Sequence, residues 1–193
     1  MFVDDVSISP GGCPPPGNCD FEDGIGCGWI QDTQDDLDWL ILKADSPENV
    51  GGPIYDHTNM AFDGKSYTRE TIFSFAGYFA LVGALGLHAS EGKRARLYSP
   101  MFLKSDETFC LHFWFSASGP NIGTLQVYRA KVSDVAKKAK IWEFVAGKEN
   151  TVSDAWSEGQ IQYVVSFPLT IFTTFTCLLR ESKTTLPSLF YCK

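Results

Sequence analysis

Two closely spaced cysteines stand in the segment of the chain that is richest in chemically versatile side chains. Cys19 and Cys27 are separated by seven residues, and carboxylates and tryptophans surround them. A zinc site would need a second cysteine pair or histidines at matching spacing, and a thioredoxin-like motif has only two residues between its cysteines. The spacing therefore favours a small disulfide loop.

Carboxylates of the same segment could bind a calcium ion. Asp20, Glu22, Asp36 and Asp38 offer the hard oxygen ligands that Ca²⁺ requires. The segment lacks the residue order of an EF-hand, so a calcium site would have to assemble from separate loops. The alternative is that these carboxylates cap turns and solvate a loop, in which case the chain requires no cofactor.

The sequence lacks the usual catalytic motifs. His57, His88 and His112 do not occur in the H-E-x-x-H spacing of a zinc protease. Gly64–Ser66 resembles the end of a phosphate-binding P-loop, but Asn59 stands where that loop begins with glycine. No G-x-S-x-G nucleophile motif occurs either. We therefore expect no catalytic residues, no enzymatic activity and no small-molecule substrate.

Composition and charge indicate an extracellular chain that does not bind nucleic acid. An even number of cysteines, six in 193 residues, is typical of an oxidising compartment. A net charge of −7 and a pI near 4.9 disfavour nucleic acids and anionic membranes as partners. Residues 1–5 show neither the basic nor the apolar region of a signal peptide, so we expect a fragment of a longer secreted or membrane-associated protein.

Two short basic segments interrupt this acidic chain. One contains Lys93, Arg94 and Arg96, and the other lies at residues 137–140 with three lysines. We interpret both segments as solvated faces, and a local anion or glycan site is the alternative.

Alternating apolar residues predict antiparallel strands in a β-sandwich. Phe109, Leu111, Phe113 and Phe115 share one face of a predicted strand, and similar alternation occurs in segments 125–127 and 161–167. Trp114 falls on the opposite face, so one face must be covered by a second sheet, a loop or a partner. Turn-forming residues separate these segments. Residues 132–139 have apolar spacing that fits either a short helix or a long loop.

Nine short motifs follow one another along the chain. They are Cys19–Gly24, Cys27–Asp32, Asp36–Trp39, Gly52–Pro53, Asp56–Thr58, Gly77–Phe79, Lys93–Pro100, Cys110–Phe115 and Gly123–Val127. In this order they resemble the motifs of MAM domains, and the resemblance extends from Cys19 to Phe167. It implies an antiparallel, jelly-roll-like β-sandwich stapled by disulfides, of the adhesive kind found in neuropilins, meprin-type proteases and receptor tyrosine phosphatases.

The resemblance also implies a domain organisation. Residues 1–13 look like the end of a preceding MAM-like repeat, 14–18 form a Pro/Gly linker, and 19–167 form the MAM-like domain with an insertion at 59–76. Residues 168–193 depart from the family and form an atypical tail that lacks the expected closing strand. A sandwich without that strand would have an unpaired sheet edge. Residues 167–179 could substitute as a strand or could remain unfolded.

The disulfide pairing is likewise implied by the resemblance. Cys19 is expected to pair with Cys27, and Cys110 with either Cys177 or Cys192. Each such bridge stabilises a module of this kind by about 2–4 kcal/mol. Cys13, as the last cysteine of the preceding repeat, would lack its partner and remain an unpaired thiol.

These observations predict a noncatalytic protein-interaction or adhesion module at the cell surface or outside the cell. Its expected partners are other extracellular proteins, including further copies of itself, and neighbouring MAM repeats. Two alternatives remain: an accessory ectodomain of an enzyme such as a meprin-like protease or receptor phosphatase, and a glycan-binding sandwich.

Overall fold

The described residues of the chain form strands and no helix. The computed structural model describes residues 1–10, 19–22, 24, 28–49, 52–53, 55–58, 77–82, 92–102, 104, 106, 108–117, 123–145, 153–164, 166 and 168–176. The predicted linker at 14–18, the insertion at 59–76 and the residues after 176 lie outside this set. In the described part of the chain, no helix is long and apolar enough to cross a membrane.

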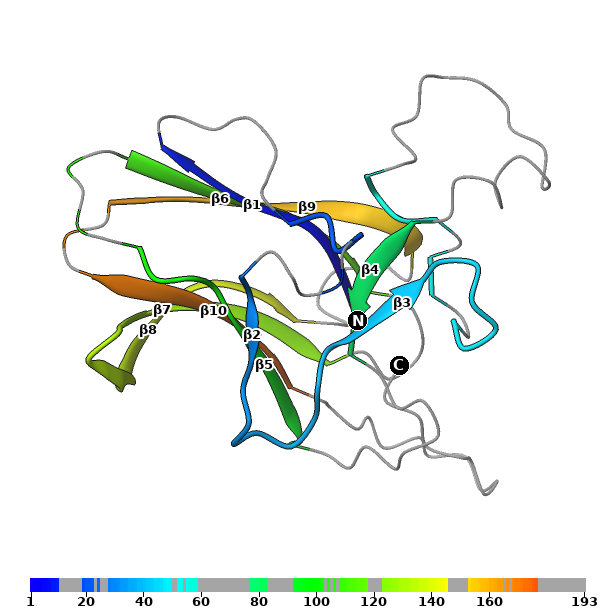
Figure 1. Cartoon of the computed structure of the whole chain (residues 1–193), viewed down its shortest axis with the longest axis horizontal. Coiled ribbons are helices and arrows are strands. Elements are labelled where there is room, and N and C mark those ends of the chain that lie inside the picture. The colour runs from blue at the N-terminus through cyan, green and yellow to red at the C-terminus, as the bar shows by residue number, and fades with distance from the viewer. Residues whose placement is uncertain are drawn as a thin grey trace.

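The described residues form ten strands, which build two sheets that face each other (Figure 1). The first sheet has the order β3-β4-β1-β6-β9 and the second sheet the order β2-β5-β10-β7-β8. Every pairing within them is antiparallel, which confirms the predicted all-β sandwich. The bounds are β1 Phe2–Pro10, β2 Ile30–Gln31, β3 Leu40–Lys43, β4 Tyr78–Leu81, β5 Arg94–Tyr98, β6 Thr108–Ala117, β7 Thr124–Lys131, β8 Asp134–Val145, β9 Ser153–Val164 and β10 Leu169–Thr176.

Aromatic side chains from both sheets meet in the core between them. Phe113 and Phe115 of β6 are buried, as their alternation predicts, and both contact Trp142 of β8 edge-on, with ring centroids 5.0 and 5.3 Å apart. Leu125 and Val127 of β7 are completely buried in the same cluster. Full burial of one such side chain stabilises the fold by about 1.5–3 kcal/mol.

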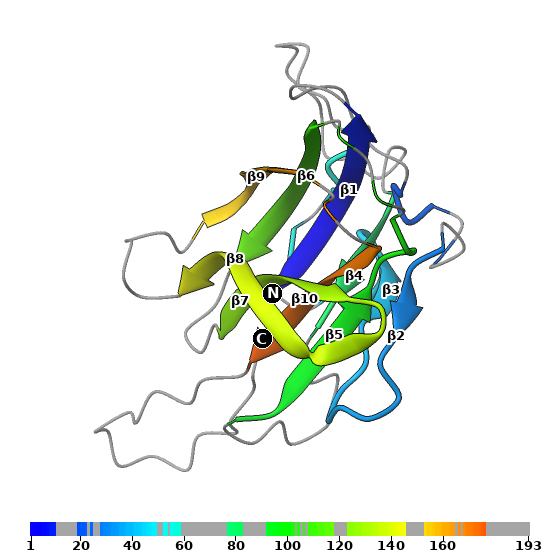
Figure 2. The same ribbon diagram turned by 90° about the vertical axis from the view of Figure 1, so that its left-hand side faces the viewer.

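Strand β1 lies inside the first sheet rather than in a separate unit. It pairs with β4 on one side and with β6 on the other, and Figure 2 shows it between these two strands. Val3 and Val6 are buried in the core. The segment that resembles the end of a preceding repeat is therefore part of this sandwich, because long-range pairing decides its place.

Strand β10 begins in the segment that the sequence assigned to an atypical tail. It is a central strand of the second sheet, paired with β5 and β7 over residues 169–176. Ile171 enters the core with no exposed surface. The four threonines of this segment favour a strand, since β-branched side chains fit a pleated surface.

Residues 132–139 form neither of the structures that their apolar spacing suggested. The chain turns at Val132 and Ser133 and returns as β8, which pairs with β7 to form a hairpin. Strand β8 is the edge of the second sheet, and its three lysines interrupt an edge that would otherwise recruit other strands.

A glycine on β9 allows the core ring of Phe113 to lie against the neighbouring strand. Gly159 pairs with Phe113 across β6 and β9, and a Cβ atom built at Gly159 would lie 2.4 Å from the tip of that ring. The ring has no free space to retreat, because it is 1% exposed and packs against Trp142.

We therefore expect Gly159→Ala to destabilise the sandwich by about 1–3 kcal/mol through overpacking. The matched control is Gln160→Ala at the next, exposed position of β9, which should change stability by less than about 0.5 kcal/mol. Chemical denaturation measures both free energies of unfolding. Equal stabilities of the two variants would contradict the packing argument.

Candidate functional site

The outer face of the first sheet is covered by the protein's own chain. The ring of His57 stacks on Trp114 with centroids 3.9 Å apart, and the His57 backbone amide donates a hydrogen bond of 2.8 Å to Asp4 Oδ2. Trp156 Nε1 donates to the Tyr55 carbonyl at 3.1 Å. The sequence predicted that a second sheet, a loop or a partner must cover one of the two faces on which Phe113 and Trp114 lie. In the structure, a loop covers the face of Trp114.

Two buried aspartates hold this covering segment, and the sequence did not single them out. Asp4 and Asp56 have no exposed surface, and Asp56 Oδ1 accepts a hydrogen bond of 3.1 Å from the Gly77 amide. Asp56 begins the motif Asp56–Thr58, whereas Asp4 lies in the segment that resembles the end of a preceding repeat. Their carboxylates satisfy backbone amides, which buried loops require.

The outer face of the second sheet is different, because it carries charged side chains in rows. Along β5, Ala95 and Leu97 enter the core, whereas Arg94, Arg96 and Tyr98 lie on the outer face. This division follows from the two-residue period of a strand.

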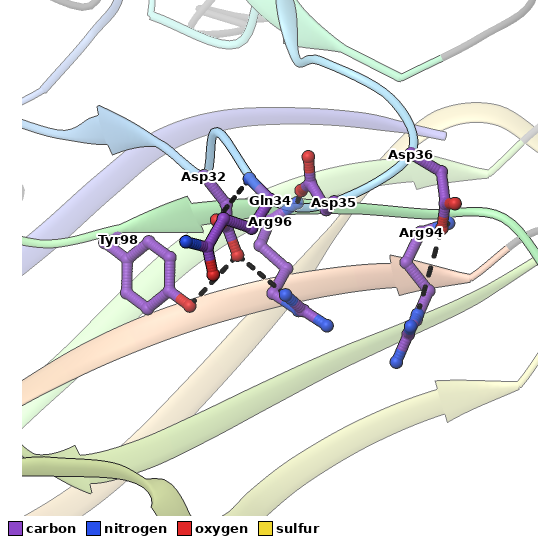
Figure 3. Close-up of polar contacts among 7 residues, drawn as sticks. All are labelled: Asp32, Gln34, Asp35, Asp36, Arg94, Arg96 and Tyr98. Carbon is purple, nitrogen blue, oxygen red and sulfur yellow. Dashed lines mark hydrogen bonds and ion pairs between the residues drawn. The ribbon is translucent and has the colours of Figure 1, made fainter.

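The acidic segment after β2 runs beside β5 and is anchored to it by the backbone. The Asp32 amide donates to the Arg96 carbonyl at 3.1 Å, and the Asp36 amide donates to the Arg94 carbonyl at 3.0 Å. Leu37 and Ala95 add a parallel bridge. Carboxylates of one segment are thereby placed next to the arginines of the other (Figure 3).

Asp32 lies at the centre of this network. Its Oδ2 atom is 2.7 Å from Arg96 Nη1 and accepts a hydrogen bond of 3.2 Å from the Tyr98 hydroxyl. The Gln34 amide donates to its Oδ1 at 2.9 Å. Burial alone would raise the pKa of Asp32, but these hydrogen bonds and the charge of Arg96 outweigh burial and lower the pKa. Asp32 and Arg96 therefore form a fixed ion pair.

Asp35 has the opposite electrostatic environment. Burial and the negative charges of Asp32 and Asp38 raise its pKa to about 6, although the Arg96 backbone amide donates to its Oδ2. Asp35 therefore changes charge close to neutral pH, whereas its neighbour Asp36 accepts a hydrogen bond of 3.0 Å from the Arg94 amide.

The two basic segments of the sequence meet on this face. Lys138 Nζ of β8 lies 4.5 Å from the ring centroid of Tyr128 and 5.4 Å from that of Phe172. Burial and the nearby charges of Arg96 and Arg94 lower the pKa of Lys138. Cation–π contacts of this kind hold the lysine over the aromatic side chains of the sheet. The candidate site is thus an outer face with both charge signs, formed by the acidic segment 32–36, β5 and Lys138.

The residues predicted as calcium ligands do not form a described metal site. Asp20 Oδ1 accepts a hydrogen bond from the Glu22 amide at 3.2 Å, and Glu22 Oε1 accepts one from the Tyr78 amide at 2.8 Å. Asp36 contacts Arg94, and Asp38 is exposed. Among the residues with described positions, no group of three or more histidines, cysteines and acids could hold a metal ion. Calcium binding stays a prediction.

The predicted disulfide pairings involve cysteines that lie largely outside the described residues. Cys19 and Cys110 are buried, at 3% and 2% exposure, and each is disulfide-bonded. Their expected partners Cys27, Cys177 and Cys192, and the predicted unpaired Cys13, are not described. Which cysteines pair therefore remains a prediction.

We expect Asp35→Asn to stabilise the domain at pH 7.5 and to have a much smaller effect at pH 3.5. The folded-state pKa of Asp35 lies at about 6, above its ordinary value of 3.8, so stability that this group contributes at low pH is lost as pH rises through 6. Asparagine keeps an oxygen for the Arg96 amide but carries no charge. Solvent screening limits the gain to about 1 kcal/mol.

Thermal unfolding of both proteins at several pH values measures this difference. The exposed Asp106, replaced by asparagine, serves as a control that should show no gain. A gain from Asp35→Asn that is equally large at pH 3.5 and 7.5 would show that charge is not its cause.

Comparison with known proteins connects this fold to a family. A family model described as "MAM domain, meprin/A5/mu" matches residues 19–181. The chain is 34% identical to neuropilin-1 of Gallus gallus over 128 residues, which cover 65% of this chain and 12% of that protein. It is 28% identical to thyroid hormone-induced protein B of Xenopus laevis over 168 residues, which cover 83% and 21%.

A further relative is MAM domain-containing protein 2 of Homo sapiens, 27% identical over 170 residues that cover 84% of this chain and 21% of that protein. The chain thus spans about a fifth or less of the length of these relatives. Among solved structures, the K1 cleaved adhesin domain of Lys-gingipain from Porphyromonas gingivalis W83 aligns with a TM-score of 0.49 and 13% identity, over 89% of this chain and 95% of that chain. Because the family match covers most of the sequence, the predicted resemblance is confirmed, and the chain belongs to the MAM domain family.

Proposed function

We propose that this domain is a noncatalytic interaction module of an extracellular protein, and that it binds other proteins through the outer face of its second sheet. Membership in the MAM family supports an extracellular interaction role. The observation that carries the assignment of the face is the difference between the two sheets. Around Trp114, His57 and Tyr55 cover the outer face of the first sheet, and the ion pair described on that face joins His112 to Glu158. The second sheet presents exposed charges of both signs in neighbouring rows.

The exposed charges suit a contact in which the two partners must meet in one defined orientation. The side chains of Arg94 and Asp36 are 50% and 44% exposed, and they lie beside the fixed Arg96–Asp32 pair. Complementary charges speed association and select the correct orientation more than they add affinity. Fixed side chains also lose little entropy on binding.

A second copy of the domain is the partner that this charge pattern fits best. In a two-fold symmetric contact, each copy presents the same patch to the other, so an arginine of one copy can face an aspartate of its partner. A face with a single charge sign would repel itself. The mixture of Arg94, Lys138, Asp32 and Asp36 on one face therefore supports homophilic adhesion.

The glycan-binding alternative is less well supported by the same face. Sugar-binding grooves present open aromatic rings, but Phe172 is 1% exposed, and Lys138 lies over it and Tyr128. An accessory role beside an enzyme domain is compatible with the same contact face. Such a role requires no catalytic residue in this domain.

Bead clustering tests the proposal. Beads coated with the domain should cluster, and the double variant Arg94→Glu/Lys138→Glu should weaken clustering about tenfold, because each lost charge contact contributes up to ~1 kcal/mol. Raised salt should weaken the wild-type clustering as well.

The control variant Lys104→Glu reverses one charge, half the net change of the double variant, at an exposed position between β5 and β6, and it should cluster like the wild type. Melting temperatures measured in parallel show whether each variant remains folded. Folded double-variant beads that cluster as strongly as wild type would refute homophilic contact through this face, and wild-type beads that do not cluster would refute homophilic contact altogether.

A further inference from the structure

Cys110 lies on the outer face of the first sheet, next to the end of β1. It is the third residue of β6 and pairs in register with Ser9 of β1. The adjacent residue Leu111 belongs to the core cluster and Phe109 packs against it, so the two-residue period of the strand points Cys110 away from the core. Cys110 is 2% exposed and disulfide-bonded. Its partner must therefore reach the outer face near the end of β1.

Cys19 is disulfide-bonded as well, but it lies on the opposite face of the same sheet. It forms an antiparallel bridge with Val6 of β1, and both side chains are buried in the core cluster between the two sheets. The backbone of the first sheet thus separates Cys19 from Cys110. The two cysteines therefore have different partners.

Ring contacts across the core show how β6 aligns with β10. Two contacts cross from β6 to β8 with ring centroids 5.0 Å apart in each, Phe113–Trp142 and Phe115–Phe144. Through the register of β7, Trp142 and Phe144 are in line with Thr173 and Phe175 of β10. Strands β6 and β10 therefore run in the same direction, and Phe175 is level with Phe115.

Cys177 cannot reach Cys110 from the end of β10. Phe115 lies five residues beyond Cys110, so Thr176 is six residues further along the sandwich than Cys110, about 20 Å at ~3.3 Å per residue. Cys177 follows Thr176 directly, and adjacent Cα atoms are ~3.8 Å apart. A disulfide joins Cα atoms that lie within about 7 Å of each other. The two lengths together are too short for the gap.

Cys13 is tethered close to Cys110. It lies outside the described residues, but the chain is described on both sides of its segment: Pro10 pairs with β6, and Cys19 pairs with Val6 of β1. Whatever path the chain takes after Pro10, three residues span at most ~11 Å. Cys13 is therefore held within reach of the outer face at Cys110.

From this arrangement we propose that Cys13 is the disulfide partner of Cys110, so that a covalent bond fixes the end of β1 against β6. This pairing replaces the one implied by the resemblance, in which Cys13 stays unpaired. Formation of the bond removes two electrons and two protons from the two thiols. The disulfide of a thiol oxidoreductase accepts them and is reduced to a dithiol. The bond belongs to the first sheet and does not depend on the proposed charged contact face.

Cys192 is the alternative partner of Cys110. Sixteen residues tether it to Thr176 at the far end of the sandwich, whereas three residues tether Cys13 to Pro10. The effective concentration of a tethered group falls roughly as the −3/2 power of the tether length, which favours Cys13 about tenfold.

Nonreducing peptide mass spectrometry of the full chain, expressed behind a signal peptide, tests the pairing. Trypsin leaves the first three cysteines together in peptide 1–43 and places Cys110 in peptide 105–129. We expect these two peptides to be joined by a disulfide. A bond from peptide 105–129 to peptide 149–180 or 184–193, which carry the last two cysteines, would overturn the proposal.

Two serine variants assign the bond within peptide 1–43. In Cys13→Ser, the link between peptides 1–43 and 105–129 should be lost, and the melting temperature should fall by roughly 5–15 °C. In the matched control Cys177→Ser, the link and the melting temperature should stay as in the wild type. A link that survives Cys13→Ser, or one that is lost in Cys177→Ser, would contradict the assignment. The map of the wild-type chain tests the pairing even where Cys13→Ser does not fold.

Discussion

The pairing of β1 with two neighbours is the constraint on which the first sheet depends. The described strands β4 and β6 have no direct pairing, so the sheet is continuous only through β1. The same strand sends Val3 and Val6 into the core and holds the covering loop through Asp4. One strand thus links backbone pairing, core packing and the position of His57 over Trp114.

In the second sheet, strand β5 has one face in the core and one charged face at the surface. Residues of β5 alternate between the interior and the outer surface, and the neighbouring acidic segment supplies carboxylates to the arginines. Because Asp32 receives hydrogen bonds from both Arg96 and Tyr98, the side chains are held in position before any partner binds. The charged side chains on the surface are therefore held in fixed positions on the rigid sandwich.

Local patterns in the sequence predicted the strands and their faces, but they could not predict which distant segments lie together. The alternation around Phe113 identified the core face correctly, because the side-chain direction in a strand follows from the backbone alone. The places of β1 and β10 and the proximity of Asp35 to Arg96, 61 positions away in the sequence, depend on long-range register. The helical spacing at 132–139 was misleading, because pairing with β7 outweighs such a weak local preference. The MAM resemblance supplied the fold class, whereas only the structure assembled the charged face.

The lysines of β8 affect how many copies of this domain can pack side by side without their sheets joining. They belong to the strand at one edge of the second sheet, where Lys137, 87% exposed, pairs with Asp134 and Lys140 pairs with Glu143. Two molecules that aligned their β8 edges would have to remove water from these charged groups, and that cost opposes continuation of one sheet into the next. In a dense layer of these domains on a surface, this edge therefore opposes growth into an amyloid-like fibre.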